Sequence, residues 1–192
     1  LIETAQGLIT RVMTEPDDAT MARAIRAAMS HQLALGITSA TDPLLTPSHL
    51  RVYHQLEAEG LLSVRINGLP IRRPDGGTET LPLPERYVSD TLRIDCVKFF
   101  ADGGLSGATA AVSIPYQVTG TKGVLRFEDD ELIALMQEAH DAGFRIATHA
   151  IGDTAIEQVI SAYEAIQRTN PQPLRHRIEH LGLPTDDHLR RC

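Results

Sequence analysis

The sequence predicts an α/β fold with a mainly parallel sheet, and three observations lead to this prediction. Amphipathic helical stretches alternate with short β-branched or apolar runs over most of the chain. Three of these helical stretches end at a glycine directly before the next run, at Gly36, Gly60 and Gly143. Strands that alternate with helices favour parallel pairing, because parallel strands need long crossover connections.

The first two helix–strand pairs lie in the N-terminal half of the chain. Helical periodicity runs from about Asp18 to Leu35, and the strand-like run ITSAT follows Gly36. A second helix is predicted from Ser48 to Glu59, where Pro47 suits a first helical turn, and LLSVRI follows Gly60. Glycine fits both junctions because the residue after a helix often takes a left-handed conformation, which carries no Cβ penalty for glycine.

Three more strands are predicted further along the chain. RIDCVKFF spans Arg93 to Phe100, and FRIATH follows a helix predicted from Asp129 to Ala142. RHRIEH, from Arg175 to His180, follows a helix predicted from Thr154 to Arg168. With the two strands before them, these make five strands, four of which follow a predicted helix.

Five such strands suit either an open doubly wound sheet or a (β/α)8 barrel, and the pattern alone does not decide. A complete barrel needs roughly 250 residues, so a chain of 192 residues would supply only part of one. The chain starts at Leu1 without a methionine, and a helix start at Pro184 to Asp187 comes just before its end. We therefore expect one truncated domain, residues 1–192. The loop from Gly103 to about Phe127 is rich in glycine, serine and threonine, and it follows a strand, where binding loops lie.

Composition excludes several classes of function. The formal net charge of −7 argues against nucleic-acid binding, which usually requires a clustered basic surplus. Cys96 and Cys192 are too few for a disulfide framework, and no apolar run approaches the ~20 residues that cross a bilayer. We expect a cytoplasmic protein with neither a nucleic-acid nor a membrane partner.

Side chains suited to catalysis lie at three predicted strand ends. Lys98 lies inside the apolar run CVKFF, His149 ends RIATH and His180 ends RIEH. One such histidine is usually structural, and the lysine alone suits a sheet edge or a pair with Asp102. Two histidines with a buried lysine indicate a metal site, because neutral imidazole is a common ligand and a lysine carbamate is a carboxylate that can bridge two metals.

Neighbouring residues receive more modest predictions. Asp102 shares the strand face of the lysine, and it either orients a substrate or accepts hydrogen bonds in the following turn. Asp153 is predicted as a helix N-cap. Glu179 is expected to face the helices in a salt bridge, and His176 and Arg177 are expected in a barrel interior or at the rim of the site.

Four strings of the sequence resemble the amidohydrolase superfamily, in particular the amidohydrolase 3 group with its N-substituted formamide deformylase-like enzymes. They are GITSATDP, VKFFADGGLSGATA, FRIATHAIGDTAIEQVISAYE and RHRIEHLGLP. The resemblance implies a partial (β/α)8 TIM barrel, about strands 2 to 6 with their helices and with both barrel ends missing. It also implies that Lys98, His149 and His180 bind one or two divalent metal ions, with zinc the expected ion.

The same resemblance implies hydrolysis of a carbon–nitrogen bond in an amide-like small molecule by metal-activated water. Asp102, Gly103 and Gly104 are the candidate substrate-binding residues. The family's His-x-His pair and its general-base aspartate do not occur in this chain, so we expect the fragment alone to be inactive, and absence of the metal from it is compatible with the resemblance.

Two alternatives remain open. One is a metal-free barrel enzyme in which the amine of Lys98 forms a Schiff base, as desolvated lysines can. The other is a non-catalytic segment that associates through its unpaired strand edges, with a homo-oligomer as one form of such association.

Overall fold

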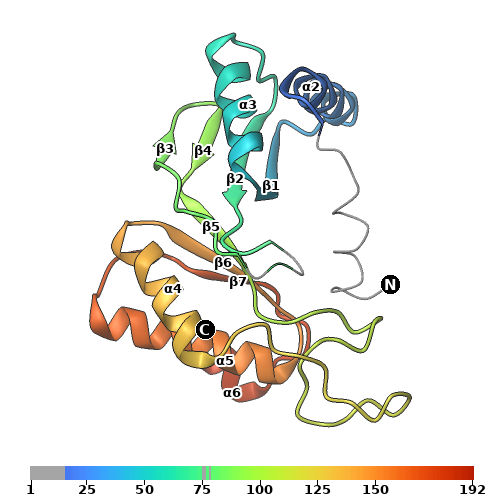
Figure 1. Ribbon diagram of the computed structural model, residues 1–192, viewed down its shortest axis with the longest axis vertical. Coiled ribbons are helices and arrows are strands. Elements are labelled where there is room, and N and C mark those ends of the chain that lie inside the picture. Colours follow the sequence, from blue (N-terminus) through green and yellow to red (C-terminus); the bar gives the residue numbers. More distant parts are fainter. Residues whose placement is uncertain (1–15, 75–76, 78) are drawn as a thin grey trace. The chain divides into compact units, whose positions relative to one another are not determined.

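The computed structural model describes residues 16–74, 77 and 79–192. These residues divide after Val97, within the strand β5 (Cys96–Phe100), into two compact units, each with a sheet and helices (Figure 1). The first unit contains α2 (Asp18–Ala34), β1 (Ser39–Leu45), α3 (Pro47–Ala58), β2 (Arg65–Pro70), β3 (Tyr87–Val88) and β4 (Leu92–Ile94). The second sheet and its helices are β5 (Cys96–Phe100), α4 (Asp129–Asp141), β6 (Arg145–Ala150), α5 (Asp153–Thr169), β7 (Arg177–His180) and α6 (Asp186–Arg191).

The sheet of the first unit has the strand order β1-β2-β4-β3. β1 pairs in parallel with β2, and β2 pairs in parallel with β4, as the alternation of helices and strands predicted. The short strand β3 is antiparallel to β4 and was not predicted. Apolar side chains of α2, α3 and the strands form the core of this unit: Met21, Met29, Leu45, Val52, Tyr53, Leu56, Leu62, Val64, Ile66, Leu92 and Ile94.

The single strand predicted from Arg93 to Phe100 is two strands in the structure. β4 ends at Ile94 and belongs to the first sheet, whereas β5 starts at Cys96 and belongs to the second. Asp95 separates them, and its buried carboxylate accepts a hydrogen bond of 2.6 Å from Arg93. Aspartate is disfavoured inside strands, so a break at this residue is consistent with its side-chain chemistry.

The sheet of the second unit has the order β5-β6-β7, with β6 and β7 parallel in a register that sets His149 beside Glu179. Figure 1 shows α4 and α5 lying along one side of this sheet. Leu132, Met136 and Ala139 of α4 are fully buried, at the spacing of one helix face. We call the side of this sheet that carries α4 and α5 the helix face, and the opposite side the site face.

The three junction glycines confirm the predicted helix ends. Gly36, Gly60 and Gly143 have φ angles of 78°, 68° and 78°, in the left-handed region that glycine adopts without strain. Among the described residues the strands form two sheets and no closed barrel, so the α/β class is confirmed while the barrel portion stays a prediction. No helix in the described part of the chain has the length and apolarity needed to span a bilayer.

Candidate functional site

The predicted ligand residues Lys98, His149 and His180 lie on the three neighbouring strands of the second sheet, β5, β6 and β7. The ring centroids of His149 and His180 are 4.7 Å apart. The ring of Phe100 lies 4.9 Å from that of His149, and Nζ of Lys98 lies 4.6 Å from the centroid of the Phe100 ring. The structure therefore brings all three predicted residues to one cluster.

Strand alternation places Lys98 and His149 on the site face. Their neighbours Phe99 and Thr148 point to the helix face, where the ring of Phe99 contacts Phe127 and the hydroxyl of Thr148 bonds to a tyrosine of α5. Because successive side chains of a strand point to opposite faces, Lys98 and His149 point away from the helices. Lys98 is only 5% exposed, so its amine has little solvent around it.

His180 reaches the same cluster by a different route. Ile178, two residues earlier on β7, packs against the apolar cluster of α5, so simple alternation would send His180 to the helix face as well. Instead, His180 and Leu181 have positive φ angles of 71° and 47°. This left-handed turn ends the strand and lets the ring of His180 meet that of His149.

The hydrogen bonds of His149 define its tautomer. Nε2 lies 2.9 Å from the carbonyl oxygen of Gly103, which can only accept a hydrogen bond, so Nε2 carries the proton. In a neutral ring Nδ1 then keeps its lone pair and is the nitrogen available to a metal. Ligating histidines usually donate their other N–H to a carbonyl or a carboxylate in this way.

The surroundings of His180 favour the form that binds metals. The residue is exposed, but partial desolvation of its ring lowers its pKa, and the neighbouring His149 and Lys98 lower it further by charge repulsion, against the opposite effect of Glu179 and Asp102. A lowered pKa favours the neutral imidazole, which is the ligating form.

Asp102 lies directly beyond β5 and is fully buried. Oδ2 accepts hydrogen bonds from the backbone N–H groups of Ala111 (2.9 Å) and Gly152 (2.8 Å), and Oδ1 accepts one from Ile151 (3.0 Å). Of the two roles that the sequence suggested, accepting hydrogen bonds is the one that these contacts resemble, but the donors lie further along the loop and after β6 and not in the turn directly after Asp102. A substrate contact by this carboxylate finds no support in the geometry, because both oxygens are bonded and closed to solvent.

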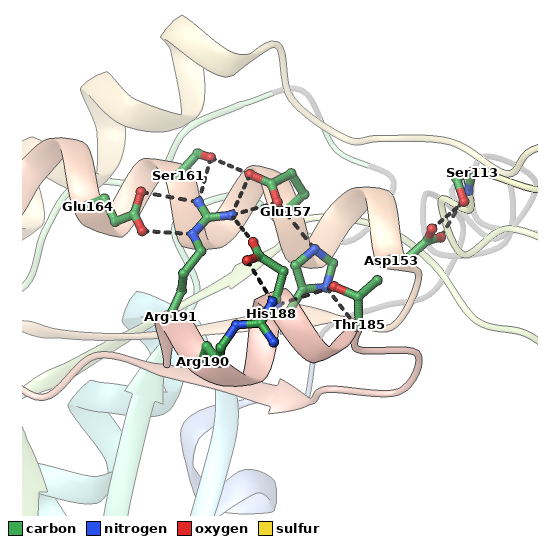
Figure 2. A network of polar contacts seen from close by, with 10 residues as sticks. Ser113, Asp153, Glu157, Ser161, Glu164, Thr185, His188, Arg190 and Arg191 are labelled. Carbon is green, nitrogen blue, oxygen red and sulfur yellow. Dashed lines mark hydrogen bonds and ion pairs between the residues drawn. The ribbon is translucent and has the colours of Figure 1, made fainter.

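The loop after β5 is tied a second time to the end of β6. Asp153 accepts hydrogen bonds from both the backbone N–H and the hydroxyl of Ser113, as Figure 2 shows. Asp153 was predicted as the N-cap of α5, but the N-cap is Gly152 and Asp153 is the first helical residue. Its carboxylate bonds to the loop because Ser113 offers two donors beside it.

Two further predictions on β7 need correction. Glu179 forms the expected salt bridge, at 2.6 Å from Arg177, but it shares the site face with His149 instead of facing the helices, since Ile178 takes the helix side. His176 was expected in the barrel interior or at the rim, yet its ring packs against His140 of α4 and Tyr163 of α5 on the helix face. A strand that alternates from Ile178 places both residues where they are found.

The residues present fit a metal site in part. Within the described ranges no three histidine, cysteine, aspartate or glutamate side chains gather as a ligand set. Two imidazoles do meet, and the buried Lys98 beside them would complete a set of three as a carbamate. The donor chemistry of this cluster thus suits a divalent ion that prefers nitrogen and oxygen ligands.

Comparison with known proteins decides the family. The sequence model of the amidohydrolase family matches residues 1–192, the whole of the chain. The chain belongs to the amidohydrolase family. This confirms the resemblance drawn from the HAIGD and RIEH segments.

Relatives of this amidohydrolase chain include a Bacillus subtilis protein, YtcJ, that is named as an amidohydrolase and is 29% identical over 92% of the chain and 33% of its own length. N-substituted formamide deformylase of Arthrobacter pascens is 26% identical over 81% of the chain and 30% of its own length. The chain therefore spans about a third of the length of the curated relatives that it matches.

Two solved structures share the fold of this amidohydrolase chain, and both are named as uncharacterized metal-dependent hydrolases. The one from Pyrococcus horikoshii has a TM-score of 0.79 and 30% identity, covering 97% of the chain and 37% of its own. The one from Pyrococcus furiosus has a TM-score of 0.79 and 27% identity, covering 97% and 38%. A divalent metal is thus a property of this family, and the α/β fold of the chain is that of its hydrolases.

Proposed function

We propose that the protein containing this chain is a metal-dependent hydrolase that cleaves a carbon–nitrogen bond in an amide-like small molecule. The family match supports hydrolysis in general. The observation that carries the finer proposal is the contact of two imidazoles, His149 and His180, beside the buried Lys98 on three neighbouring strands. Titratable side chains that are desolvated and close together, such as two histidines and a buried lysine, are typical of functional sites, metal sites included.

Each residue of the cluster has a role in this proposal. His149 would hold the ion through Nδ1, because its Nε2–H bonds to Gly103. His180 would bind as a neutral imidazole, and Lys98 as a carbamate, a carboxylate made from its neutral amine and carbon dioxide. Zinc is the ion that we propose, since nitrogen and carboxylate ligands suit it. A bound divalent ion supplies an activated water and polarises the carbonyl of the substrate.

The loop after β5 forms the substrate side of the proposed site. Gly104 is partly exposed at its start, and we propose that it lines the substrate together with Gly103, whose carbonyl holds His149. A His-x-His pair and a general-base aspartate are implied by the family resemblance but do not occur among these 192 residues. We therefore propose that the chain by itself turns over no substrate. The formal charge of −7 gives no support to a nucleic-acid partner.

The test is the metal content of the intact protein, measured by elemental mass spectrometry after purification without chelators. We expect one or two equivalents of a divalent ion in the wild-type protein and a loss of that ion in the His149→Ala/His180→Ala variant. His31→Ala removes an exposed imidazole of α2 and is the matched control, which should keep the metal.

No metal in any of these proteins, even after zinc is offered back, would overturn the proposal. The buried amine of Lys98 would then become the leading candidate, and borohydride trapping of a substrate adduct on it would test a Schiff-base mechanism. A loss of metal in the His31→Ala control as well would show that the ion was bound outside the cluster.

A further inference from the structure

The carboxylate of Asp102 joins two segments that the sequence keeps apart. It is 0% exposed and accepts three backbone N–H groups, one from Ala111 in the loop after β5 and two from Ile151 and Gly152 after β6. A buried carboxylate is costly unless it is fully hydrogen-bonded, so this group is held firmly in one position.

The same carboxylate lies against a predicted metal ligand. Oδ1 of Asp102 is 3.4 Å from Nε2 of His149, and the carbonyl oxygen of Gly103, the next residue along, is 2.9 Å from the same nitrogen. Both oxygens are acceptors only, so together they require a proton on Nε2. If the turn at Asp102 and Gly103 moved, these two acceptors would no longer require a proton on Nε2 of His149.

We infer that Asp102 is a positioning residue, which fixes the ring orientation of His149 and its Nε2–H tautomer and so leaves Nδ1 as the ligand nitrogen. The tautomer itself follows from the hydrogen bonds alone, whereas the consequence for metal binding rests on the proposed function. This role goes beyond holding the loop in place, because the carboxylate of Asp102 also acts on Nε2 of His149.

Asp102→Asn tests this role with almost no change in shape. The oxygen of asparagine best replaces Oδ2, where it accepts two N–H groups, and its NH2 group then takes the place of Oδ1. The variant also loses the hydrogen bond from Ile151, because an NH2 group cannot accept that backbone N–H. That NH2 faces Nε2 of His149 at 3.4 Å and offers a donor where an acceptor was. A donor at this place favours a bare Nε2 and a proton on Nδ1, which removes the lone pair from the ligand nitrogen.

Asp153→Asn is the matched control. Asp153 ties the same loop to the segment after β6, but it does so by accepting hydrogen bonds from the backbone N–H and the hydroxyl of Ser113. If loosening the loop were all that mattered, both variants would change His149 alike. A positioning role predicts an effect of Asp102→Asn only.

The first experiment is nitrogen-15 NMR of the metal-free intact protein with labelled histidine, at a pH where imidazoles are neutral and with His149→Gln to assign the signal. We expect His149 to be Nε2–H in the wild-type protein and in Asp153→Asn, and to shift toward Nδ1–H in Asp102→Asn. An Nδ1–H form in the wild-type protein, or the same tautomer in all three proteins, would overturn the inference. If Asp102→Asn does not fold, an Nδ1–H form in the wild-type protein would still overturn the inference.

The second experiment is zinc affinity of the same proteins, measured by competition with a chelating dye. Loss of a group that orients a ligand typically weakens metal binding ~10–100-fold. We expect this loss in Asp102→Asn and a change below about threefold in Asp153→Asn. Equal weakening of zinc binding in both variants would show that Asp102 only holds the loop in place. A wild-type protein that binds no zinc would end the proposed function, while the tautomer measurement would still decide the role of Asp102.

Discussion

Gly152 is the position where a single methyl group should separate the loop after β5 from the end of β6. Its backbone angles, φ −74° and ψ 150°, are open to any residue, so Gly152→Ala introduces no conformational strain of its own. The added Cβ would instead lie 1.8 Å from the carbonyl oxygen of Ala111 and 2.4 Å from its carbon. Both are backbone atoms, so no rotamer change relieves the overlap.

The size of the destabilisation follows from the hydrogen bonds that Ala111 loses when it moves. Real Cβ atoms do not approach closer than 3.0 Å, so the backbone has to move by more than an ångström. Its N–H then loses Asp102, and its carbonyl loses the N–H of Thr154 at 3.1 Å. A charge-assisted hydrogen bond contributes about 1.5–3 kcal/mol and a neutral one about 1 kcal/mol. With an overpacking cost of about 1–3 kcal/mol, we expect a destabilisation of about 4 kcal/mol.

Urea unfolding of the intact protein, followed by far-ultraviolet circular dichroism, measures this loss. Gly104→Ala is the matched control, because its Cβ would meet nothing nearer than the Ser106 hydroxyl at 4.0 Å. We expect the control to stay within about 0.5 kcal/mol of the wild-type protein. Equal stability of Gly152→Ala and Gly104→Ala would refute the close approach of the two backbones.

Three further predictions concern the helix side of the second unit. Burial, with a smaller contribution from His140, lowers the pKa of His176 to about 4. Unfolding therefore takes up a proton as the pH falls below about 6.5, and the free energy of unfolding should fall by about 1 kcal/mol by pH 5, after a discount for the half-buried ring. His176→Gln should reduce this pH dependence of the free energy of unfolding in urea titrations, and an unchanged pH dependence would contradict the prediction. Tyr163→Phe removes a hydroxyl 2.7 Å from the Thr148 side chain and should cost about 1–2 kcal/mol in the same assay, whereas a neutral result would show that the hydroxyl is dispensable. Arg191→Gln breaks the ion pairs with Glu157 in Figure 2 and should lower the thermal midpoint less at high salt than at low salt, and a salt-independent difference would argue against an electrostatic cause.

The helices and their glycine ends were predictable because local chemistry decides them. Gly36, Gly60 and Gly143 end helices by a backbone preference that each residue carries by itself. Strand pairing is not local, so the antiparallel strand β3 and the break at Asp95 were missed. Both features depend on which strands are neighbours in the sheet, and the hydrophobic periodicity of the sequence does not specify the neighbours.

The candidate ligands were predictable for a similar reason, since residues at the ends of successive parallel strands meet at one edge of the sheet. Lys98, His149 and His180 do meet there. Hydrogen bonding by Asp102 was one of two predicted roles, but its three donors were not predicted, because backbone N–H groups are not distinguished in the sequence.

His180 shows why side-chain alternation is a poor guide at the end of a strand. Counting from Ile178 would exclude this histidine from the site, because both positions share the helix face. The positive φ angles of His180 and Leu181 reverse that outcome, and such an angle is uncommon for a leucine, whereas histidine adopts it more readily. The turn is therefore a condition for the contact between the two imidazoles and not a separate sign of a site, because Leu44 and Ala108 also have positive φ angles and are not part of the cluster.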